Sequence, residues 1–212
     1  MKVSIVSITT PVIPEVKTAE DLIVYCARVS NPENQLNFDT GEKLIKYMIM
    51  NGHWSPFEMA SMCVEIETSH AIAKQILRHR SFSFQEQSLR FSSNVEIEHI
   101  EPRLQGANRQ GGETYTLLPQ GMLNRMGRHI NASISLYGDL LDLGIARECA
   151  RMVLPLAGRT RLYMNGTIRS WIHYLQQRLD EHAQKEHRLI AQEIANIFKD
   201  NFPTIYKVAI DD

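Results

Sequence analysis

A cluster of polar residues in the first half of the chain has the residue types and spacing that ligand binding needs. Gln75, Arg78 and His79 recur at the i, i+3, i+4 spacing that places side chains on one face of a helix, which is predicted over residues 70–79. A stretch rich in Ser, Gln and Glu then leads to Arg90. A single cation near a helix C-terminus often only complements the helix dipole. Arg78, His79 and Arg80 in a row, followed by Arg90, instead indicate a site for an anionic ligand.

The cations of the chain are distributed unevenly. Between residues 78 and 188 there are 14 arginines and one lysine, although the net charge is −1. Guanidinium groups bind phosphate and carboxylate through paired hydrogen bonds, and lysine cannot. We therefore expect a binder of small anionic molecules. An RNA- or DNA-binding module that uses Phe82, Phe84 and Phe91 between the arginines is the alternative, and the net charge argues against it.

Hydrophobic periodicity gives the elements that must position these groups. Strands are predicted at residues 3–8, 62–66 and 95–99, and helices at 18–27, 40–50, 70–79, 117–143, 145–152, 167–182 and 183–198. Thr18 and Asp21 are spaced to cap the first helix, and Asn51-Gly52 to end the second. Few strands and many helices predict an α+β fold with helices packed on a mainly antiparallel sheet. At 212 residues the chain is predicted to form a single domain, residues 1–212.

Composition excludes several classes of protein. Cys26, Cys63 and Cys149 are far apart and lie among apolar residues, which predicts buried free thiols rather than a disulfide framework or a zinc site. No metal site is predicted. The N-terminal residues are too polar for a signal peptide, and no apolar run approaches the roughly 20 residues of a membrane span. We expect a cytoplasmic protein without a membrane partner.

The spacing around the polar cluster is similar to that of a known family. Arg78-His79-Arg80, followed after seven residues by Ser88, matches the signature of flavin-dependent thymidylate synthases. Other segments resemble the family too: His53-x-Ser55-Pro56-Phe57-Glu58, Glu86-x-Ser88-x-Arg90, Ala150-Arg151-x-Val153-Leu154-Pro155 and Arg178-x-x-x-His182-Ala183. The similarity covers most of the chain.

The resemblance implies two sets of ligand contacts. Those to FAD would come from Ser55, Arg78, His79, Arg80, Glu86, Thr167, Ile168, Arg169 and His173. Those to dUMP would come from Gln75, Ile76, Leu77, Arg78, Glu86, Gln87, Ser88, Leu89, Arg90, Arg151 and Arg178. Arg178 resembles the catalytic family residue that favours the N3-deprotonated uracil and so makes C5 more nucleophilic. The alternative is that the aliphatic part of the Arg178 side chain only extends so that its charged end reaches water. Where the family usually has Asn-x-Arg, this sequence has Thr167-Ile168-Arg169.

The resemblance also implies a reaction and an assembly. NADPH reduces FAD, 5,10-methylenetetrahydrofolate donates a carbon to C5 of dUMP, and the reduced flavin supplies the hydride that completes the methyl group of dTMP. No cysteine lies beside the motif, which argues against a cysteine nucleophile. The family forms a homotetramer with shared active sites, in which Gln75, Arg78, Arg151 and Arg178 would come from one chain and residues 86–90 from a neighbour. A flavoprotein without synthase activity is a third interpretation.

Overall fold

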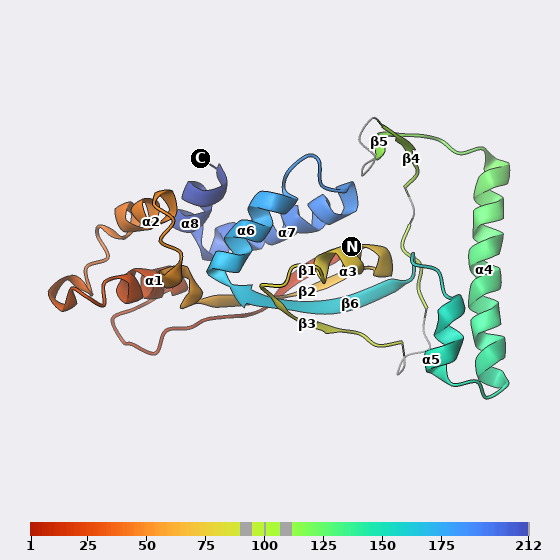
Figure 1. The fold of residues 1–212 in the computed structure, drawn as a ribbon, viewed down its shortest axis with the longest axis horizontal. Coiled ribbons are helices and arrows are strands. Elements are labelled where there is room, and N and C mark those ends of the chain that lie inside the picture. Colours follow the sequence, from red (N-terminus) through yellow and green to blue (C-terminus); the bar gives the residue numbers. More distant parts are fainter. Residues whose placement is uncertain (90–94, 100, 107–111, 212) are drawn as a thin grey trace. The chain divides into compact units, whose positions relative to one another are not determined.

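The computed structural model describes residues 1–89, 95–99, 101–106 and 112–211 (Figure 1). The chain divides into two compact units. The first unit consists of Met1, Glu67–Ile76 and Glu86–Leu162, and the second of Lys2–Ile66, Leu77–Gln85 and Tyr163–Asp212. The single domain expected from chain length stays a prediction.

The elements mix helices and strands. The strands are β1 (Lys2–Ile8), β2 (Ser61–Ser69), β3 (Ser83–Glu86), β4 (Arg103–Gln105), β5 (Gly112–Tyr115) and β6 (Arg159–Thr167). The α-helices are α1 (Ala19–Ala27), α2 (Gly41–Met50), α3 (His70–Ile76), α4 (Gln120–Asp142), α5 (Arg147–Ala150), α6 (Ile168–Arg178), α7 (Lys185–Asn201) and α8 (Pro203–Tyr206). Short 3₁₀ turns cover Pro32–Asn34, Ser55–Glu58 and Arg151–Val153, and a short π-helix covers Lys207–Asp211.

Four strands form one sheet in the order β1-β2-β6-β3, and β4 pairs with β5 in a separate antiparallel ribbon. Backbone hydrogen bonds give the direction of the central pair. The amide of Ile168, at the end of β6, donates to Ala60 O just before β2 (3.0 Å). The amide of His70, just after β2, donates to Gly158 O just before β6 (2.9 Å). Residue numbers rise along one strand as they fall along the other, so the pair is antiparallel and the predicted α+β class is confirmed.

Alternation on the two central strands makes one face of the sheet apolar. Met62, Val64 and Ile66 are fully buried on β2, and Leu162 and Met164 are fully buried on β6. In the second unit, helices α6 and α7 lie over this sheet (Figure 1). Their apolar stripes, which include Trp171, Ile172, Leu175, Ile190, Ile194 and Phe198, are also buried. The indole N–H of Trp171 donates to Met62 O (2.9 Å), so this large side chain enters the core without an unpaired donor.

Local signals at the first two helices are confirmed. The Thr18 hydroxyl accepts from the amide of Asp21 (3.0 Å), and the Asp21 carboxylate accepts from the amide of Thr18 (3.1 Å), which forms a capping box at the start of α1. Helix α2 ends at Met50, and Gly52 follows with φ of 69°. Glycine adopts this left-handed conformation without the steric cost that other residues carry, so it can end the helix.

Three predicted elements differ from the structure. The helix predicted over 70–79 ends at Ile76, because the chain turns there and buries Phe82. The strand predicted at 95–99 is only an isolated bridge between Ile97 and Gly158. Strands β3 and β6 were not predicted at all, and the helix predicted over 167–182 starts as expected, with Thr167 as its N-cap, but ends at Arg178. The glycines at 106, 111 and 112 also predict a flexible polar loop, which falls mostly outside the described residues.

The cysteines are free, as expected, but less buried than predicted. Cys149 is exposed, and Cys26 and Cys63 are half-buried. Cys149 lies on the exposed side of helix α5, with Arg147 and Glu148. Partial burial raises the pKa of the Cys26 and Cys63 thiols, which makes both weaker nucleophiles at neutral pH. Among the described residues, no helix has the combined length and hydropathy that crossing a bilayer needs.

Candidate functional site

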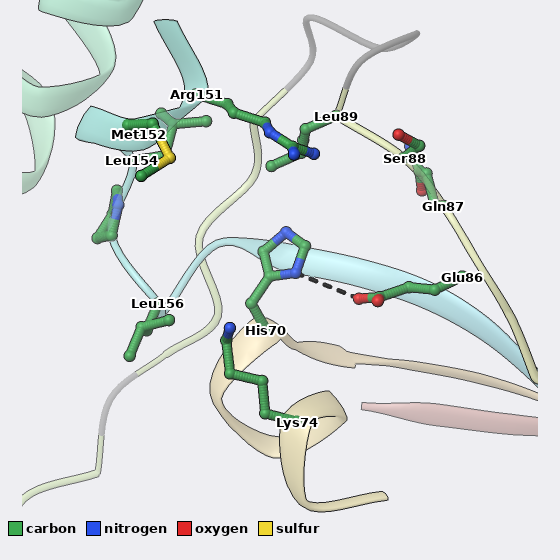
Figure 2. A pocket seen from close by; sticks show the side chains of 11 residues that line it. His70, Lys74, Glu86, Gln87, Ser88, Leu89, Arg151, Met152, Leu154 and Leu156 are labelled. Carbon is green, nitrogen blue, oxygen red and sulfur yellow. Dashed lines mark ion pairs between the residues drawn. The ribbon is translucent and has the colours of Figure 1, made fainter. Parts of the chain in front are cut away.

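A pocket of about 520 Å³ opens in the first unit (Figure 2). Its volume falls within the range of small-molecule sites. Cationic, acidic and apolar side chains share the wall, which consists of His70, Lys74, Glu86, Gln87, Ser88, Leu89, Arg151, Met152, Leu154, Pro155 and Leu156. A mixed lining of this kind suits a ligand that has both charged and neutral parts.

Three elements bring these residues together. Helix α3 supplies His70 and Lys74, which are one helical turn apart and so share a face. Strand β3 delivers Glu86 to the pocket, and the amide of Gln87 continues the pairing with β6 through Arg161 O (2.8 Å). The 3₁₀ turn Arg151–Val153 supplies Arg151 and stops before Pro155, whose ring cannot extend it.

Glu86 is held by two hydrogen-bond donors. The Thr160 hydroxyl on β6 donates to Oε1 of Glu86 (3.0 Å), and Nδ1 of His70 lies 3.3 Å from the same oxygen. The hydrogen bond from His70 is the main reason that the pKa of Glu86 is lowered, and Thr160 and the positive charge of Lys74 act in the same direction. The pocket therefore contains an ionised carboxylate opposite cationic side chains.

A second polar cluster surrounds Arg178 in the second unit. The Nε–H of Arg178 donates to Nε2 of His79 (2.9 Å), so the imidazole is neutral at that nitrogen. Burial and the neighbouring guanidinium lower the pKa of His79 to about 4. Behind it, Nε2 of the fully buried His187 lies 3.2 Å from the Tyr174 hydroxyl, and the rings of Tyr174 and His79 meet edge to face at 4.9 Å. Arg178 is thus fixed through Nε, and no described residue accepts a hydrogen bond from its two terminal nitrogens, which suit a ligand.

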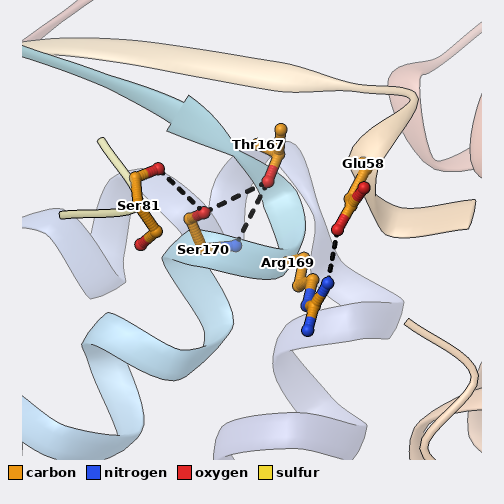
Figure 3. A network of polar contacts seen from close by, with 5 residues as sticks. All are labelled: Glu58, Ser81, Thr167, Arg169 and Ser170. Atoms are coloured by element: carbon orange, nitrogen blue, oxygen red, sulfur yellow. Dashed lines mark hydrogen bonds and ion pairs between the residues drawn. The ribbon is translucent and has the colours of Figure 1, made fainter. Parts of the chain in front are cut away.

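A third cluster, also in the second unit, lies around the start of α6 (Figure 3). The Thr167 side chain caps the helix by accepting from the amide of Ser170 (3.4 Å), and the Ser170 hydroxyl donates to Ser81 O (3.1 Å). This ties α6 to the turn that follows Arg80. Arg169 points away from the core and pairs with Glu58 at 2.5 Å.

Five of the nine residues assigned to FAD have the exposure that a bound cofactor needs. Ser55, Arg78, Arg80, Arg169 and His173 are all exposed in the second unit. Exposed guanidinium groups fit a pyrophosphate, and one of them is already oriented by a carboxylate. The His173 ring meets Trp54 edge on at 4.7 Å, which adds an aromatic surface to the same region. The donor set therefore fits a nucleotide cofactor such as FAD.

Comparison with known proteins gives the family. Residues 11–204 match the family model described as thymidylate synthase complementing protein. The chain belongs to that family. It is 44% identical over 217 residues to a probable flavin-dependent thymidylate synthase of Paramecium bursaria Chlorella virus 1, with 98% of each chain covered. It is 48% identical over 211 residues to a flavin-dependent thymidylate synthase of Synechocystis sp., with 97% of each covered. A relative from Thermotoga neapolitana with the same name is 34% identical, with 88% of this chain and 84% of the relative covered.

Membership of the thymidylate synthase complementing protein family confirms the resemblance carried by the Arg-His-Arg motif. The chain is a flavin-dependent thymidylate synthase family enzyme by sequence, and these comparisons do not support a nucleic-acid-binding module. Every relative named above covers more than four-fifths of this chain, so the matches are not confined to the motif.

The structure groups most of the predicted residues of the family site, with some differences. Glu86, Gln87, Ser88 and Leu89 line the pocket together with Arg151, all in one chain. The sequence analysis placed Arg151 and residues 86–90 in different chains, whereas Arg151 and residues 86–89 line this pocket in one chain. The reason is local, since the turn that carries Arg151 leads directly into β6, beside β3. How an assembly would share the site stays a prediction.

Other predicted contacts are limited by burial. Ile76 and Ile168 are fully buried, so their side chains belong to the core and only their backbone atoms remain for a ligand. The amide of Ile168 is already bonded to Ala60 O. Gln75 and Leu77 are half-buried. Arg90 lies outside the described residues.

Three polar residues at the site were missed by the sequence analysis. His70 and Lys74 line the pocket, and Thr160 holds Glu86. The i, i+4 spacing of His70 and Lys74 on a predicted helix was a usable signal. Thr160 carried none, because the strand that contains it was not predicted.

Proposed function

We propose that the chain is a flavin-dependent thymidylate synthase that converts dUMP to dTMP, with 5,10-methylenetetrahydrofolate as carbon donor and NADPH-reduced FAD as hydride source. The family match over residues 11–204 supports this function. The proposed roles of the residues are supported by the pocket, which contains Glu86, Ser88 and Arg151. The resemblance assigns these three residues to dUMP.

Charge in the pocket suits a nucleoside monophosphate. Arg151 and Lys74 provide cations for the phosphate, and the Ser88 hydroxyl provides a neutral hydrogen bond. Glu86 is ionised and would repel a phosphate, so it suits a neutral donor group of the same ligand. We propose that dUMP binds with its phosphate toward Arg151.

Arg178 is proposed as the catalytic residue. A guanidinium with free terminal nitrogens stabilises a negative charge on the uracil, and the N3-deprotonated ring has a more nucleophilic C5. The bond from Nε to His79 fixes the plane of the guanidinium, which reduces the conformational entropy lost when the ligand binds.

We propose that Ser55, Arg78, Arg80, Arg169 and His173 hold FAD, together with His79, Glu86, Thr167 and the backbone of Ile168. The bound flavin supplies redox chemistry that no side chain of the protein has. The residues themselves bind its phosphates, orient it and exclude water. None of the pocket-lining residues is a cysteine, so the proposal includes no covalent enzyme intermediate.

We also propose a cytoplasmic homotetramer with shared active sites. Support comes from the exposed apolar side chains of α4, such as Met122, Leu123 and Leu136, which suit contact with another copy. In this proposal, the residues around the pocket of one chain act together with Arg178 of a neighbour. Closed symmetry then repeats the same site in every subunit.

The function is tested by product formation. Purified protein is incubated with dUMP, methylenetetrahydrofolate, NADPH and FAD, and dTMP is measured by mass spectrometry, with each component omitted in turn. We expect product only in the complete mixture. Arg178→Ala should abolish turnover, whereas Arg188→Ala should not, because Arg188 is also half-buried but among the described residues donates to the backbone of Glu181 alone. Product formed without flavin contradicts the proposal.

Assembly is tested by complementation. Arg151→Ala and Arg178→Ala proteins, each inactive alone, are refolded together, and mass photometry verifies mixing. Restored dTMP formation is expected, because about one site in four combines the intact residues of both parents. Verified mixing without recovered activity would mean that each chain builds its own site.

A further inference from the structure

We propose that His70 is a positioning residue of the pocket in the first unit, which holds Glu86 so that one carboxylate oxygen accepts a hydrogen bond from a sugar hydroxyl of the nucleotide. The proposal rests on the proposed function in identifying the ligand as a nucleotide. Neither the motif nor the comparisons assign a role to His70.

Both donors that hold Glu86 use the same oxygen. Nδ1 of His70 and the Thr160 hydroxyl approach Oε1, at 3.3 and 3.0 Å. Among the described residues, no donor is recorded for Oε2, and Glu86 lines the pocket. Figure 2 shows the Glu86 carboxylate facing the His70 imidazole, near Gln87 and Ser88. The two donors thus fix the rotation of the carboxylate and leave Oε2 for a ligand.

The orientation of the His70 ring is not explained by packing alone. Nε2 of His70 is buried and has no hydrogen-bond partner among the described residues. A buried polar atom without a partner costs about 1–3 kcal/mol. The ring therefore keeps its contact with Glu86 at a cost that a purely structural side chain would avoid.

The backbone around His70 also fixes the ring. The amide of His70 donates to Gly158 O (2.9 Å), and the next amide, of Ala71, donates to Leu156 O (3.0 Å). A Cβ on Gly158 would lie 3.2 Å from Pro155 O and 3.5 Å from Cδ2 of His70. Glycine at this position lets the strand end approach the imidazole closely.

The charge on Glu86 determines which ligand group Oε2 accepts. Its pKa is lowered, chiefly by the His70 hydrogen bond, so the carboxylate is ionised at neutral pH. An ionised oxygen attracts a hydroxyl or N–H donor and repels phosphate. Because Arg178 is proposed to act on the uracil and Arg151 on the phosphate, the sugar hydroxyl is the remaining donor.

Two substitutions of His70 separate its effect on Glu86 from its packing. In His70→Asn, the amide nitrogen takes the place of Nδ1 and keeps a donor for Glu86. In His70→Gln, the amide lies farther out and that donor is lost. Thr160→Val removes the other donor with little change in volume, and His182→Gln is the control, because the His182 side chain is 73% exposed.

The affinities of the FAD-loaded proteins for dUMP and for 2′,3′-dideoxyuridine monophosphate are measured by calorimetry. The wild type should prefer dUMP about tenfold, the value of one hydrogen bond to a charged group. We expect His70→Asn and the control to keep this preference. His70→Gln should lose most of it, and Thr160→Val part of it. A His70→Gln protein with the wild-type preference overturns the proposal.

A second readout does not depend on any ligand. Without His70 as donor, the pKa of Glu86 should rise, so the carboxylate protonates at higher pH in His70→Gln than in the wild type. Carbon-13 NMR of labelled glutamate measures this titration directly. An unchanged titration means that His70 does not act on Glu86. If the wild type fails to bind dUMP while the titration shifts as expected, the proposed function fails and the positioning role stands.

Discussion

Mild acid should destabilise the protein through His187 and His79, because the fold lowers the pKa of both. His187 is fully buried, and burial together with the charges of Arg178 and His79 lowers its pKa to about 3 from an ordinary value of 6.5. A histidine with a lowered pKa contributes stability that is complete above the unfolded pKa, and that stability is lost as the pH falls below it, because the unfolded chain then binds the extra proton. With these values, lowering the pH from 7 to 5 removes about 2 kcal/mol of unfolding free energy. At pH 5 the loss depends mainly on the unfolded pKa, so a folded value anywhere below about 4 gives a similar result.

Urea unfolding at pH 7 and pH 5, followed by tryptophan fluorescence at one protein concentration, measures this loss. The comparison is made with His187→Gln, which removes the titrating group, and with His182→Gln, which removes an exposed histidine. His187→Gln is expected to be less stable at both pH values because the bond to Tyr174 changes, so the informative quantity is the difference between the two pH values. This difference should shrink by about 2 kcal/mol in His187→Gln and should not change in the control. Equal pH differences in the wild type and His187→Gln would refute the reasoning.

Three further predictions follow from local geometry. Arg178→Lys should lower turnover strongly while thermal melting changes little, because lysine keeps the charge but loses the planar group that Nε fixes. Gly166→Ala should cost about 1–3 kcal/mol in urea unfolding, because a Cβ would lie 2.4 Å from the ring of the buried Phe82, whereas Gly138→Ala meets nothing within 4 Å and should not destabilise. Cys63→Ser should keep dTMP formation in the mass-spectrometric assay, because the thiol has a raised pKa and lies outside the pocket lining.

Helices were easier to predict from the sequence than strands. Helix α6 was found because Trp171, Ile172 and Leu175 repeat at helical spacing, and this signal depends only on residues close in sequence. Strand β6 was missed because its buried face includes Thr160 and Gly166, which do not read as apolar. Gly166 is buried only because Phe82, 84 residues away in the chain, packs against it. No local pattern reports such a contact.

The residues of the candidate site also differ in how readily the sequence predicts them. The Arg-His-Arg motif identified the family because its residues are close in sequence, and the same motif led to Glu86 and Ser88. The partners of these residues are distant: Thr160 is 74 residues from Glu86, and Arg178 is 99 residues from His79. Pairing of strands and helices brings them together, so only the folded chain reveals which oxygen of Glu86 is held and which nitrogen of Arg178 is used.

The contact of His79 with Arg178 and the contact of His70 with Glu86 have opposite electrostatic character. This limits how acid can affect the enzyme. His79 must be neutral at Nε2 to accept the Nε–H of Arg178, and its lowered pKa of about 4 keeps it neutral through mild acid. His70 instead donates to a carboxylate, and Glu86 stays ionised because its own pKa is lowered. Both contacts therefore persist in the folded protein at pH 5, where protonation of the unfolded chain already weakens the fold through His187. Loss of activity between pH 7 and pH 5 should accordingly follow the fraction of unfolded protein, and the protein that remains folded should keep Arg178 and Glu86 in place.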